Sequence, residues 1–239
     1  MGYSETGDLM NEQRSQGLFH EASGLLSVHR IFDTIQGEGP FVGRPAVFVR
    51  LAGCNLQCPM CDTDYTSDAR LLTVEGVLNE IADANSRKGL VVITGGEPFR
   101  QNLKPLVFKL LLGGWQVQIE TNGTLFVDLP FDHLTVVCSP KAGKISAELA
   151  PHIRAFKYVL HADSICEDDG LPRRALGHPS GASNKVARPP HGFTGPIYVQ
   201  PVDVGDPIEN ARHLQAAIGS AKWFDYTLCV QVHKIINVE

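Results

Sequence analysis

Three closely spaced cysteines are the residues of this chain best suited to chemistry. Cys54, Cys58 and Cys61 share one short loop with the spacing C-x3-C-x2-C. A four-iron cluster held by three thiolates has one iron free to take an exogenous ligand, whereas an electron carrier normally binds all four irons through cysteine. Soft thiolates on a short loop suit such a cluster. The triplet therefore predicts a 4Fe-4S cluster with one open iron.

A structural zinc site is the alternative interpretation of the triplet. Zinc needs a fourth ligand, and its sites usually show paired C-x2-C units or closely spaced histidines. No histidine lies within this loop, and the other cysteines are remote in sequence: Cys138, Cys166 and Cys229. The cluster is favoured, with zinc binding or plain thiols as the open alternatives.

A glycine pair provides the second candidate motif, Thr94-Gly95-Gly96-Glu97-Pro98. Two glycines at the end of a strand let exposed backbone groups approach a ligand that any Cβ would push away. Glu97 could accept hydrogen bonds from an ammonium group. An ordinary strand-to-helix turn is the alternative, but the combination with the cysteine triplet favours a ligand site.

The composition points to one α/β domain acting on a small polar molecule. The chain has 239 residues and a net charge of -5, which gives no reason to expect nucleic acid or a membrane as partner. The scattered cysteines and the lack of an export signal or of an apolar run near 20 residues favour the cytoplasm. Residues 1–27 are polar and aperiodic and are expected to form a flexible leader, followed by a single domain over 28–239.

Short apolar runs alternate with helical patterns along the rest of the chain. Helices are expected at about 73–84, 103–112 and 208–218. Strands are expected at Ala46–Leu51, Leu90–Ile93, Gln116–Ile119, Leu134–Val137, Phe156–Leu160, Ile197–Val199 and Thr227–Val232. Parallel strands joined by crossover helices are the natural interpretation.

The residues best suited to binding or catalysis follow the ends of these strands, as the cysteines and the glycine pair do. Chemistry that collects at the carboxyl ends of successive parallel strands is typical of a (β/α) barrel. About six units fit the length, which predicts a partial (β/α)6-type TIM barrel. A stretch at 165–195, rich in proline, glycine and serine, is interpreted as an excursion over the barrel mouth or as a disordered insertion.

The two motifs together resemble the radical S-adenosylmethionine (SAM) superfamily, over nearly the whole chain from Val28. In that superfamily the amino acid part of SAM binds the open iron, and an electron from the cluster cleaves SAM to a 5'-deoxyadenosyl radical. The resemblance therefore implies that the radical, and no side chain, begins the reaction.

Further motifs narrow the resemblance to the 7-carboxy-7-deazaguanine synthase family. They are Ile35-Gln36-Gly37-Glu38-Gly39, Arg50, Cys61-Asp62-Thr63-Asp64, Ser139-Pro140-Lys141 and His233-Lys234. The family converts 6-carboxy-5,6,7,8-tetrahydropterin to 7-carboxy-7-deazaguanine with loss of ammonia, on the route to 7-deazapurines such as queuosine. The resemblance implies a carbon-nitrogen lyase that uses the cluster, SAM and Mg2+.

The resemblance also implies roles for individual residues. Substrate contacts would be made by Ile35, Gln36, Gly37, Glu38, Arg50, Thr94, His233 and the terminal Glu239. SAM contacts would be made by Met60, Cys61, Asp62, Gly96, Glu97, Asn122, Ser139, Pro140, Lys141, Gln200, Pro201, Val202 and Asp203. Thr63 would bind Mg2+, a hard cation that prefers oxygen ligands, and the planar fork of Arg50 suits a substrate carboxylate.

The chain differs from the family at its last residue, and two other functions remain as alternatives. Family members commonly end in proline, whereas this chain ends in Glu239. The alternatives are a radical SAM enzyme of another substrate class, such as a glycyl-radical activase, and a non-catalytic iron-sulfur electron-transfer module. The family further implies a homodimer and an electron donor such as flavodoxin.

Overall fold

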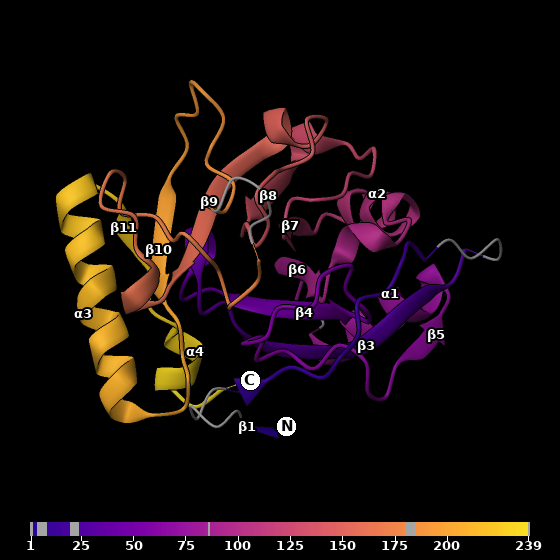
Figure 1. Ribbon diagram of the computed structural model, residues 1–239. Coiled ribbons are helices and arrows are strands. Elements are labelled where there is room, and N and C mark those ends of the chain that lie inside the picture. The colour runs from indigo at the N-terminus through magenta and orange to yellow at the C-terminus, as the bar shows by residue number, and fades with distance from the viewer. Residues whose placement is uncertain (1, 4–8, 20–23, 86, 180–184, 239) are drawn as a thin grey trace.

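A single large sheet forms the body of the protein in the computed structural model, which describes residues 2–3, 9–19, 24–85, 87–179 and 185–238 (Figure 1). The nine strands lie in the order β11-β10-β9-β8-β7-β6-β4-β3-β5. Neighbours from β4 to β11 are parallel, and β3 and β5 pair antiparallel beyond β4. The sheet is a partial barrel, because its two edge strands, β11 and β5, do not pair with each other.

The parallel strands are the apolar runs of the sequence. Leu90, Val91, Val92 and Ile93 of β6 are at most 1% exposed, as expected for a parallel strand covered on both faces. The parallel strands are β4 (Pro45–Leu51), β6 (Leu90–Gly95), β7 (Gln116–Thr121), β8 (Leu134–Cys138), β9 (Ile153–Leu160), β10 (Ile197–Pro201) and β11 (Thr227–Leu228). The antiparallel strands are β3 (Leu26–Ile35) and β5 (Arg70–Leu72), with a separate pair of β1 (Gly2–Tyr3) and β2 (Leu9–Met10).

Among the described residues, three longer helices cover the sheet, and a fourth, short helix follows near the C-terminus. In Figure 1, α1 (Val74–Ala84) and α2 (Lys104–Leu112) lie beside β3 and β7, and α3 (Pro207–Phe224) lies at the other end beside β10. Side-chain oxygens of Thr73 and Asp206 cap α1 and α3 by accepting backbone N–H bonds of the first turn. The last helix, α4 (Val232–Ile235), is a single turn.

The predicted strands and helices are found, with several differences. The helix expected at 208–218 continues to Phe224, and the short strand β5 was not expected. The strand expected at Thr227–Val232 ends at Leu228, because Val232 begins α4. The long antiparallel strand β3 was not expected, since its sequence mixes apolar and polar residues. The β7–β8 and β8–β9 connections contain only the short 3-10 turns Phe131–His133 and Ala150–His152 in place of crossover helices, so the six units are not all complete.

Part of the N-terminal segment contacts the body of the protein. Residues 11–19, which we call the strap, run against the loop that carries the three cysteines and are joined to it by hydrogen bonds. Phe19 makes a parallel bridge to Gln101, beside the end of β6. Backbone hydrogen bonds hold this segment, and such bonds leave no periodic pattern in a sequence.

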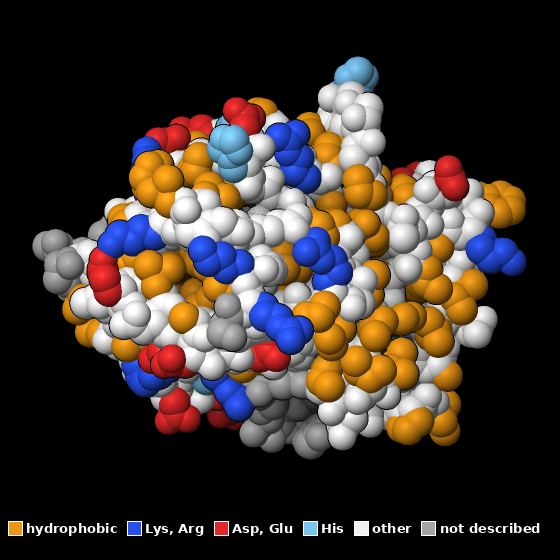
Figure 2. Space-filling view, turned by 180° about the vertical axis from the view of Figure 1, so that it is seen from behind, with side chains coloured by type: hydrophobic (Ala, Val, Ile, Leu, Met, Phe, Trp, Pro, Cys, Tyr) orange, Lys and Arg blue, Asp and Glu red, His pale blue; other side chains and the backbone are white. Residues whose placement is uncertain are grey.

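Exposed apolar side chains gather on one side of the molecule. Figure 2 shows them over the part formed by α3 and the C-terminal segment. They include Ile208, Trp223, Leu228, Ile235, Ile236 and Val238. No helix in the described part of the chain is long and apolar enough to cross a membrane.

Candidate active site

A cavity of about 370 Å³ opens at the carboxyl ends of the parallel strands. Its wall is formed by residues that end β4, β6, β7, β9 and β10, together with the cysteine loop and α4. This is the position at which (β/α) barrels place their active sites, and the volume lies within the range of small-molecule sites.

The cysteine loop, residues 53–65, is a closed ring of backbone. The N–H of Gly53 donates to the carbonyl of Tyr65 at 2.7 Å, which joins the two ends of the loop. Gly53 has a φ of +81°, a conformation that favours glycine. Cys54, Cys58 and Cys61 all face the cavity, so one short loop presents three thiols to one space.

The chemistry of these thiols fits an iron-sulfur cluster. Burial raises the pKa of Cys54 to about 12 and that of Cys58 to about 11, and burial also raises the pKa of Cys61. Thiols in such a setting ligate as thiolates only when a metal supplies the balancing charge. Of the described residues that line the cavity, no other is a cysteine, and no described group is spaced to hold a single metal ion. Three thiolates on separate irons of one cluster match this donor set.

The glycine pair lets the cysteine loop lie directly on the end of β6. A Cβ at Gly96 would lie 2.3 Å from the carbonyl oxygen of Gly53 and 2.7 Å from Cβ of Cys54. Gly95 has a φ of +140°, and a Cβ there would lie 2.2 Å from the carbonyl oxygen of Leu51. The motif therefore positions the cysteines by close backbone approach.

Glu97 of the same motif does not line the cavity. Its side chain is fully buried, and its carboxylate accepts hydrogen bonds from the N–H of Phe99 at 2.9 Å and the hydroxyl of Thr121 at 2.8 Å. The N–H of Asn122 donates to the other oxygen at 2.7 Å. Burial raises the pKa of Glu97 despite these bonds. Glu97 thus ties the end of β6 to the end of β7.

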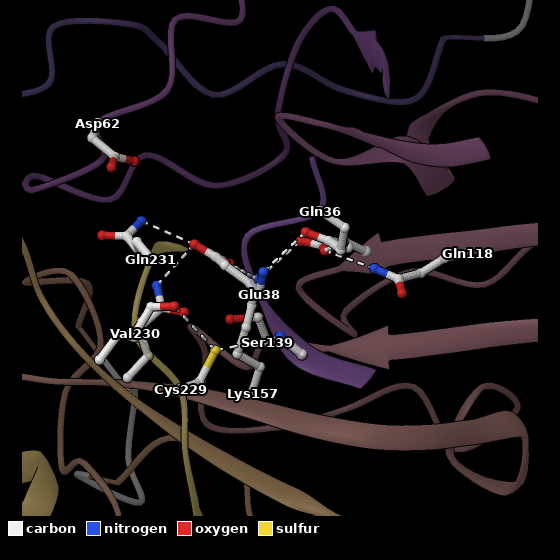
Figure 3. Close-up of polar contacts among 12 residues, drawn as sticks. Gln36, Glu38, Asp62, Gln118, Ser139, Lys157, Cys229, Val230 and Gln231 are labelled. Atoms are coloured by element: carbon white, nitrogen blue, oxygen red, sulfur yellow. Dashed lines mark hydrogen bonds and ion pairs between the residues drawn. The ribbon is translucent and has the colours of Figure 1, made fainter. Parts of the chain in front are cut away.

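A charged network forms the floor of the cavity (Figure 3). The amine of Lys157, on β9, lies between the carboxylates of Glu38 and Glu120, and its side chain is only 7% exposed. The distance to Oε2 of Glu120 is 2.9 Å. Amide groups complete the network: Gln200 and Gln231 donate to Glu38 at 3.1 and 2.9 Å.

The network keeps its buried groups charged. Burial alone would raise the pKa of Glu38, but the charge and hydrogen bond of Lys157 and the amide of Gln231 hold it at about 2. Burial would lower the pKa of Lys157, and the charges of Glu120 and Glu38 instead raise it. Gln36 and Gln118 both donate to Glu120, at 3.0 and 2.8 Å. The floor therefore presents oriented carboxylates to whatever the cavity binds.

Arg50 and Thr94 stand side by side on the wall between the floor and the cysteines. They are register partners on the parallel strands β4 and β6, and both line the cavity. The guanidinium of Arg50 lies 5.3 Å from the ring centroid of Phe32, within cation-π range. A planar cation held against an aromatic ring can bind a carboxylate through two parallel hydrogen bonds.

The C-terminal helix closes the cavity at its mouth. Lys234 of α4 pairs with Asp62 of the cysteine loop at 3.2 Å and with Asp203 after β10 at 2.7 Å. A Cβ at Gly37 would lie 1.9 Å from Nδ1 of His233. Burial lowers the pKa of His233, so this imidazole is neutral near pH 7.

The opposite wall carries Ser139 and Lys141 after β8. The Lys141 amine donates to the Ser139 hydroxyl at 2.6 Å, and burial lowers its pKa. Asn122 donates to Asn55 of the cysteine loop at 2.9 Å. These polar groups flank the thiols and could contact the amino acid part of a bound cofactor.

The structure brings most of the predicted site residues to this one cavity. Gly37, Glu97 and Pro140 do not line it, and Glu239 lies outside the described residues. The lining residues among those predicted are Ile35, Gln36, Glu38, Arg50, Cys54, Cys58, Met60, Cys61, Asp62, Thr63, Thr94, Gly96, Asn122, Ser139, Lys141, Gln200, Pro201, Val202, Asp203 and His233. Gln200, expected beside SAM, bonds to Glu38, which is expected beside the substrate.

Several lining residues were missed in the sequence. Lys157 had a usable signal, because a lysine inside the apolar run of β9 must be buried with a partner. Leu176, from the excursion at 165–195, also lines the cavity, and its carbonyl accepts the N–H of Met60 at 3.0 Å. The others with polar side chains are Tyr65, Glu120, Thr121, Gln231 and Lys234.

Comparison with known proteins shows the family of the chain. Residues 49–134 match the model of the radical SAM superfamily. A 7-carboxy-7-deazaguanine synthase from Rhodospirillum rubrum is 48% identical over 220 residues, covering 89% of this chain and 92% of the relative. One from Rickettsia prowazekii is 39% identical over 225 residues, covering 90% and 89%.

A solved structure supports the fold. The crystal structure of QueE from Escherichia coli aligns with a TM-score of 0.66 and 23% identity, over 87% of this chain and 94% of that one. The open barrel and the cysteine loop define a radical SAM enzyme, which implies a 4Fe-4S cluster and SAM as cofactors. Within that class, the chain belongs to the 7-carboxy-7-deazaguanine synthase family.

Proposed function

We propose that this chain converts 6-carboxy-5,6,7,8-tetrahydropterin to 7-carboxy-7-deazaguanine with loss of ammonia, in 7-deazapurine biosynthesis of the queuosine type. One observation carries the proposal. The three thiols, the Arg50 guanidinium and the Glu38 carboxylate line the same cavity, so a radical formed at the cluster and a pterin acid would share one enclosed space.

The cofactors are assigned to the wall nearest the thiols. Cys54, Cys58 and Cys61 would hold the cluster, and Thr63 would hold Mg2+. When bound, the cluster and SAM supply the electron and the carbon radical that begin the reaction. Ser139, Lys141 and Asp203 offer polar groups for the amino acid part of SAM.

The substrate is assigned to the floor and to the wall that carries Arg50 and Thr94. Arg50 would bind its carboxylate through two hydrogen bonds. Glu38 and Glu120 accept hydrogen bonds, and Gln36 both donates and accepts, which suits the N–H and carbonyl groups of a pterin ring. The aromatic rings of Phe32 and Phe48 line the same space. His233 stays neutral and is positioned to contact the substrate from the mouth.

The deciding experiment is anaerobic reconstitution followed by turnover. The iron-loaded, reduced protein should cleave SAM and form 7-carboxy-7-deazaguanine from the carboxytetrahydropterin. Cys58→Ala should lose the cluster and both activities, whereas Cys166→Ala, a buried cysteine that does not line the cavity, should keep them. SAM cleavage without pterin turnover would point to a radical SAM enzyme of another substrate class. No cleavage would favour an electron-transfer module.

Two partners are proposed, an electron donor and a second copy of the chain. An electron donor such as flavodoxin would reduce the cluster in the cytoplasm. The exposed apolar surface formed by α3 and the C-terminal segment supports a homodimer, because monomers rarely expose large contiguous apolar patches (Figure 2). Light scattering on Trp223→Glu, a residue 84% exposed on α3, should show monomers where the unmodified protein shows dimers.

A further inference from the structure

The strap, residues 11–19, is bonded to the cysteine loop along the length of that loop. Near its start, the N–H of Gln16 donates to the carbonyl of Cys54 at 2.7 Å. In the middle, Asn11 donates from its backbone to Pro59 at 2.7 Å and from its side chain to the carbonyl of Cys58 at 3.1 Å. Two of the three cysteines thus have their own carbonyl groups held by the strap.

Gln13 holds the far end of the loop. Its side-chain N–H donates to the carbonyl of Thr63 at 2.9 Å, and its side-chain oxygen accepts the N–H of Tyr65 at 2.7 Å and the hydroxyl of Thr66 at 3.0 Å. The Tyr65 hydroxyl donates back to the carbonyl of Gln13 at 3.2 Å. One amide side chain therefore bridges both sides of Tyr65, the residue whose carbonyl closes the loop onto Gly53.

Arg100 fixes the strap to the body of the protein. Its buried guanidinium donates to the carbonyls of Gln16 and Gly17 in the strap, at 3.2 and 2.8 Å, and to that of Ala52 before the cysteine loop at 3.0 Å. The N–H of Phe19 donates to the carbonyl of Arg100 at 2.8 Å. The strap is thereby anchored at the end of β6 as well as along the loop.

These bonds have a direct consequence for ligand geometry. The cysteine loop has no helix or strand between Gly53 and Tyr65, and its own backbone bonds are the one that joins Gly53 to Tyr65 and one from Cys61 to Cys58. Cys54 therefore depends on contacts from outside the loop to stay in place relative to the other two thiols. Buried carbonyl groups need hydrogen-bond donors, and the strap supplies them at Cys54, Cys58, Pro59 and Thr63. A ligand set fixed before the metal arrives loses less entropy on binding and opens less often afterwards.

We propose that the strap is part of the cluster site, with Asn11 and Gln13 as positioning residues that hold the cysteine loop in its ligating shape. The inference rests on the proposed function, since the cluster is the group the loop would hold. Without the side chain of Gln13, the loop opens at its Thr63 and Tyr65 end and exposes the cluster to solvent and oxygen.

Two measurements on the full-length protein test this. The first is amide hydrogen exchange over residues 54–65 in the iron-free protein. The second is the rate at which the visible absorbance of the reconstituted cluster bleaches in air. Gln13→Ala removes two bonds to the loop backbone, so both rates should rise about tenfold. Gln13→Glu can still accept from Tyr65 but cannot donate to Thr63, and its rates should be intermediate. Asn11→Ala should act in the same direction.

Matched controls separate positioning from general destabilisation. Ser15→Ala changes an exposed strap residue that makes no hydrogen bond to the loop among the described contacts, and both rates should stay unchanged. Amides of β7 serve as an internal control, because exchange there reports unfolding of the sheet.

The outcomes separate this inference from the proposed function. Unmodified protein that assembles no cluster overturns the proposed function and the assignment of the strap to a cluster site. A stable cluster in the unmodified protein, with exchange and bleaching of Gln13→Ala at the rates of Ser15→Ala, overturns the strap inference alone. Faster exchange with unchanged bleaching also overturns it, because ordering of the loop would then have no effect on the cluster.

Discussion

Gly37 and His233 pack so closely that a Cβ at residue 37 would lie 1.9 Å from Nδ1 of the imidazole. The N–H of Val232 also donates to the Gly37 carbonyl at 3.1 Å. The short helix α4 therefore reaches the cavity only because residue 37 has no side chain. Gly37 thus provides the space for His233.

Gly37→Ala should displace α4 and weaken substrate binding, while the cysteine loop is unaffected. Overpacking of this kind costs about 1 to 3 kcal/mol, which corresponds to a loss of roughly 5- to 150-fold in affinity. Calorimetric titration of the pterin substrate measures this. Gly219→Ala, on α3 with nothing near the added Cβ, should bind substrate normally, and equal affinity for the two variants would contradict the packing argument.

Lys157→Met should destabilise the protein strongly near neutral pH. The change leaves the buried carboxylates of Glu38 and Glu120 without their shared cation, and breaking a buried pair in this way typically costs about 3 to 5 kcal/mol. Lys104→Met breaks an exposed pair with Asp128 and should cost at most about 1 kcal/mol. Urea unfolding of both variants at pH 7 gives the comparison.

The buried ion pair between Lys157 and Glu38 predicts how the stability of the protein depends on pH. The pKa of Glu38 is about 2 in the folded protein, below the ordinary value of 4.5. Its contribution to stability is therefore complete above pH 4.5 and is lost as the pH falls towards 2. Unfolding free energies measured between pH 7 and pH 3 should show the gap between Lys157→Met and the unmodified protein narrowing in acid. A constant gap would mean that the pair does not control this titration.

Arg50→Ala should weaken substrate binding and leave the cluster intact. Removing a charged hydrogen-bond donor costs about 1.5 to 3 kcal/mol, whereas iron content depends on the cysteines. Arg50→Lys keeps the charge but loses the fork, so it should recover only part of the affinity. Arg44→Ala, an exposed arginine at the other end of the β3–β4 pair, is the control. Unaltered substrate affinity in Arg50→Ala would remove Arg50 from the site.

Glu97→Gln tests a structural role against the expected contact with the ammonium group of SAM. An amide in this position must turn its NH2 group towards at least one of three donors, from Phe99, Thr121 and Asn122. The mismatch should cost about 1 to 3 kcal/mol of stability. Glu75→Gln, at an exposed position on α1, should be nearly neutral. Weaker SAM binding with an unchanged melting temperature would restore the ligand role.

Local spacing in the sequence could predict that the three cysteines share one loop and that the glycine pair stands at the end of a strand. The three thiols face one cavity because their spacing lies within one closed loop, and the glycines follow a strand whose apolar run is unmistakable. The hydrogen-bond partners of a side chain could not be predicted from local spacing. Glu97 has the right type and place for a ligand contact, but its carboxylate already accepts from Phe99 in the turn after β6, from Thr121 of β7 and from Asn122 after β7.

Contacts between segments that are remote in the sequence could not be predicted either. The sequence shows Glu38, Glu120 and Lys157 as unrelated residues, and only the order of the strands brings them together. The strap was missed for a similar reason. Its contacts use backbone groups and polar side chains, and neither produces the periodic apolar pattern on which helix and strand assignment depends.

The ion pair between Lys234 and Asp62 joins residues 172 positions apart. The cavity is thus closed by α4, near one end of the sequence, and the cysteine loop is braced by the strap, near the other. Both segments must be in place before the site is complete. Domains fold as units, so the cluster site forms only together with the fold of the whole domain, because its parts come from segments far apart in the sequence.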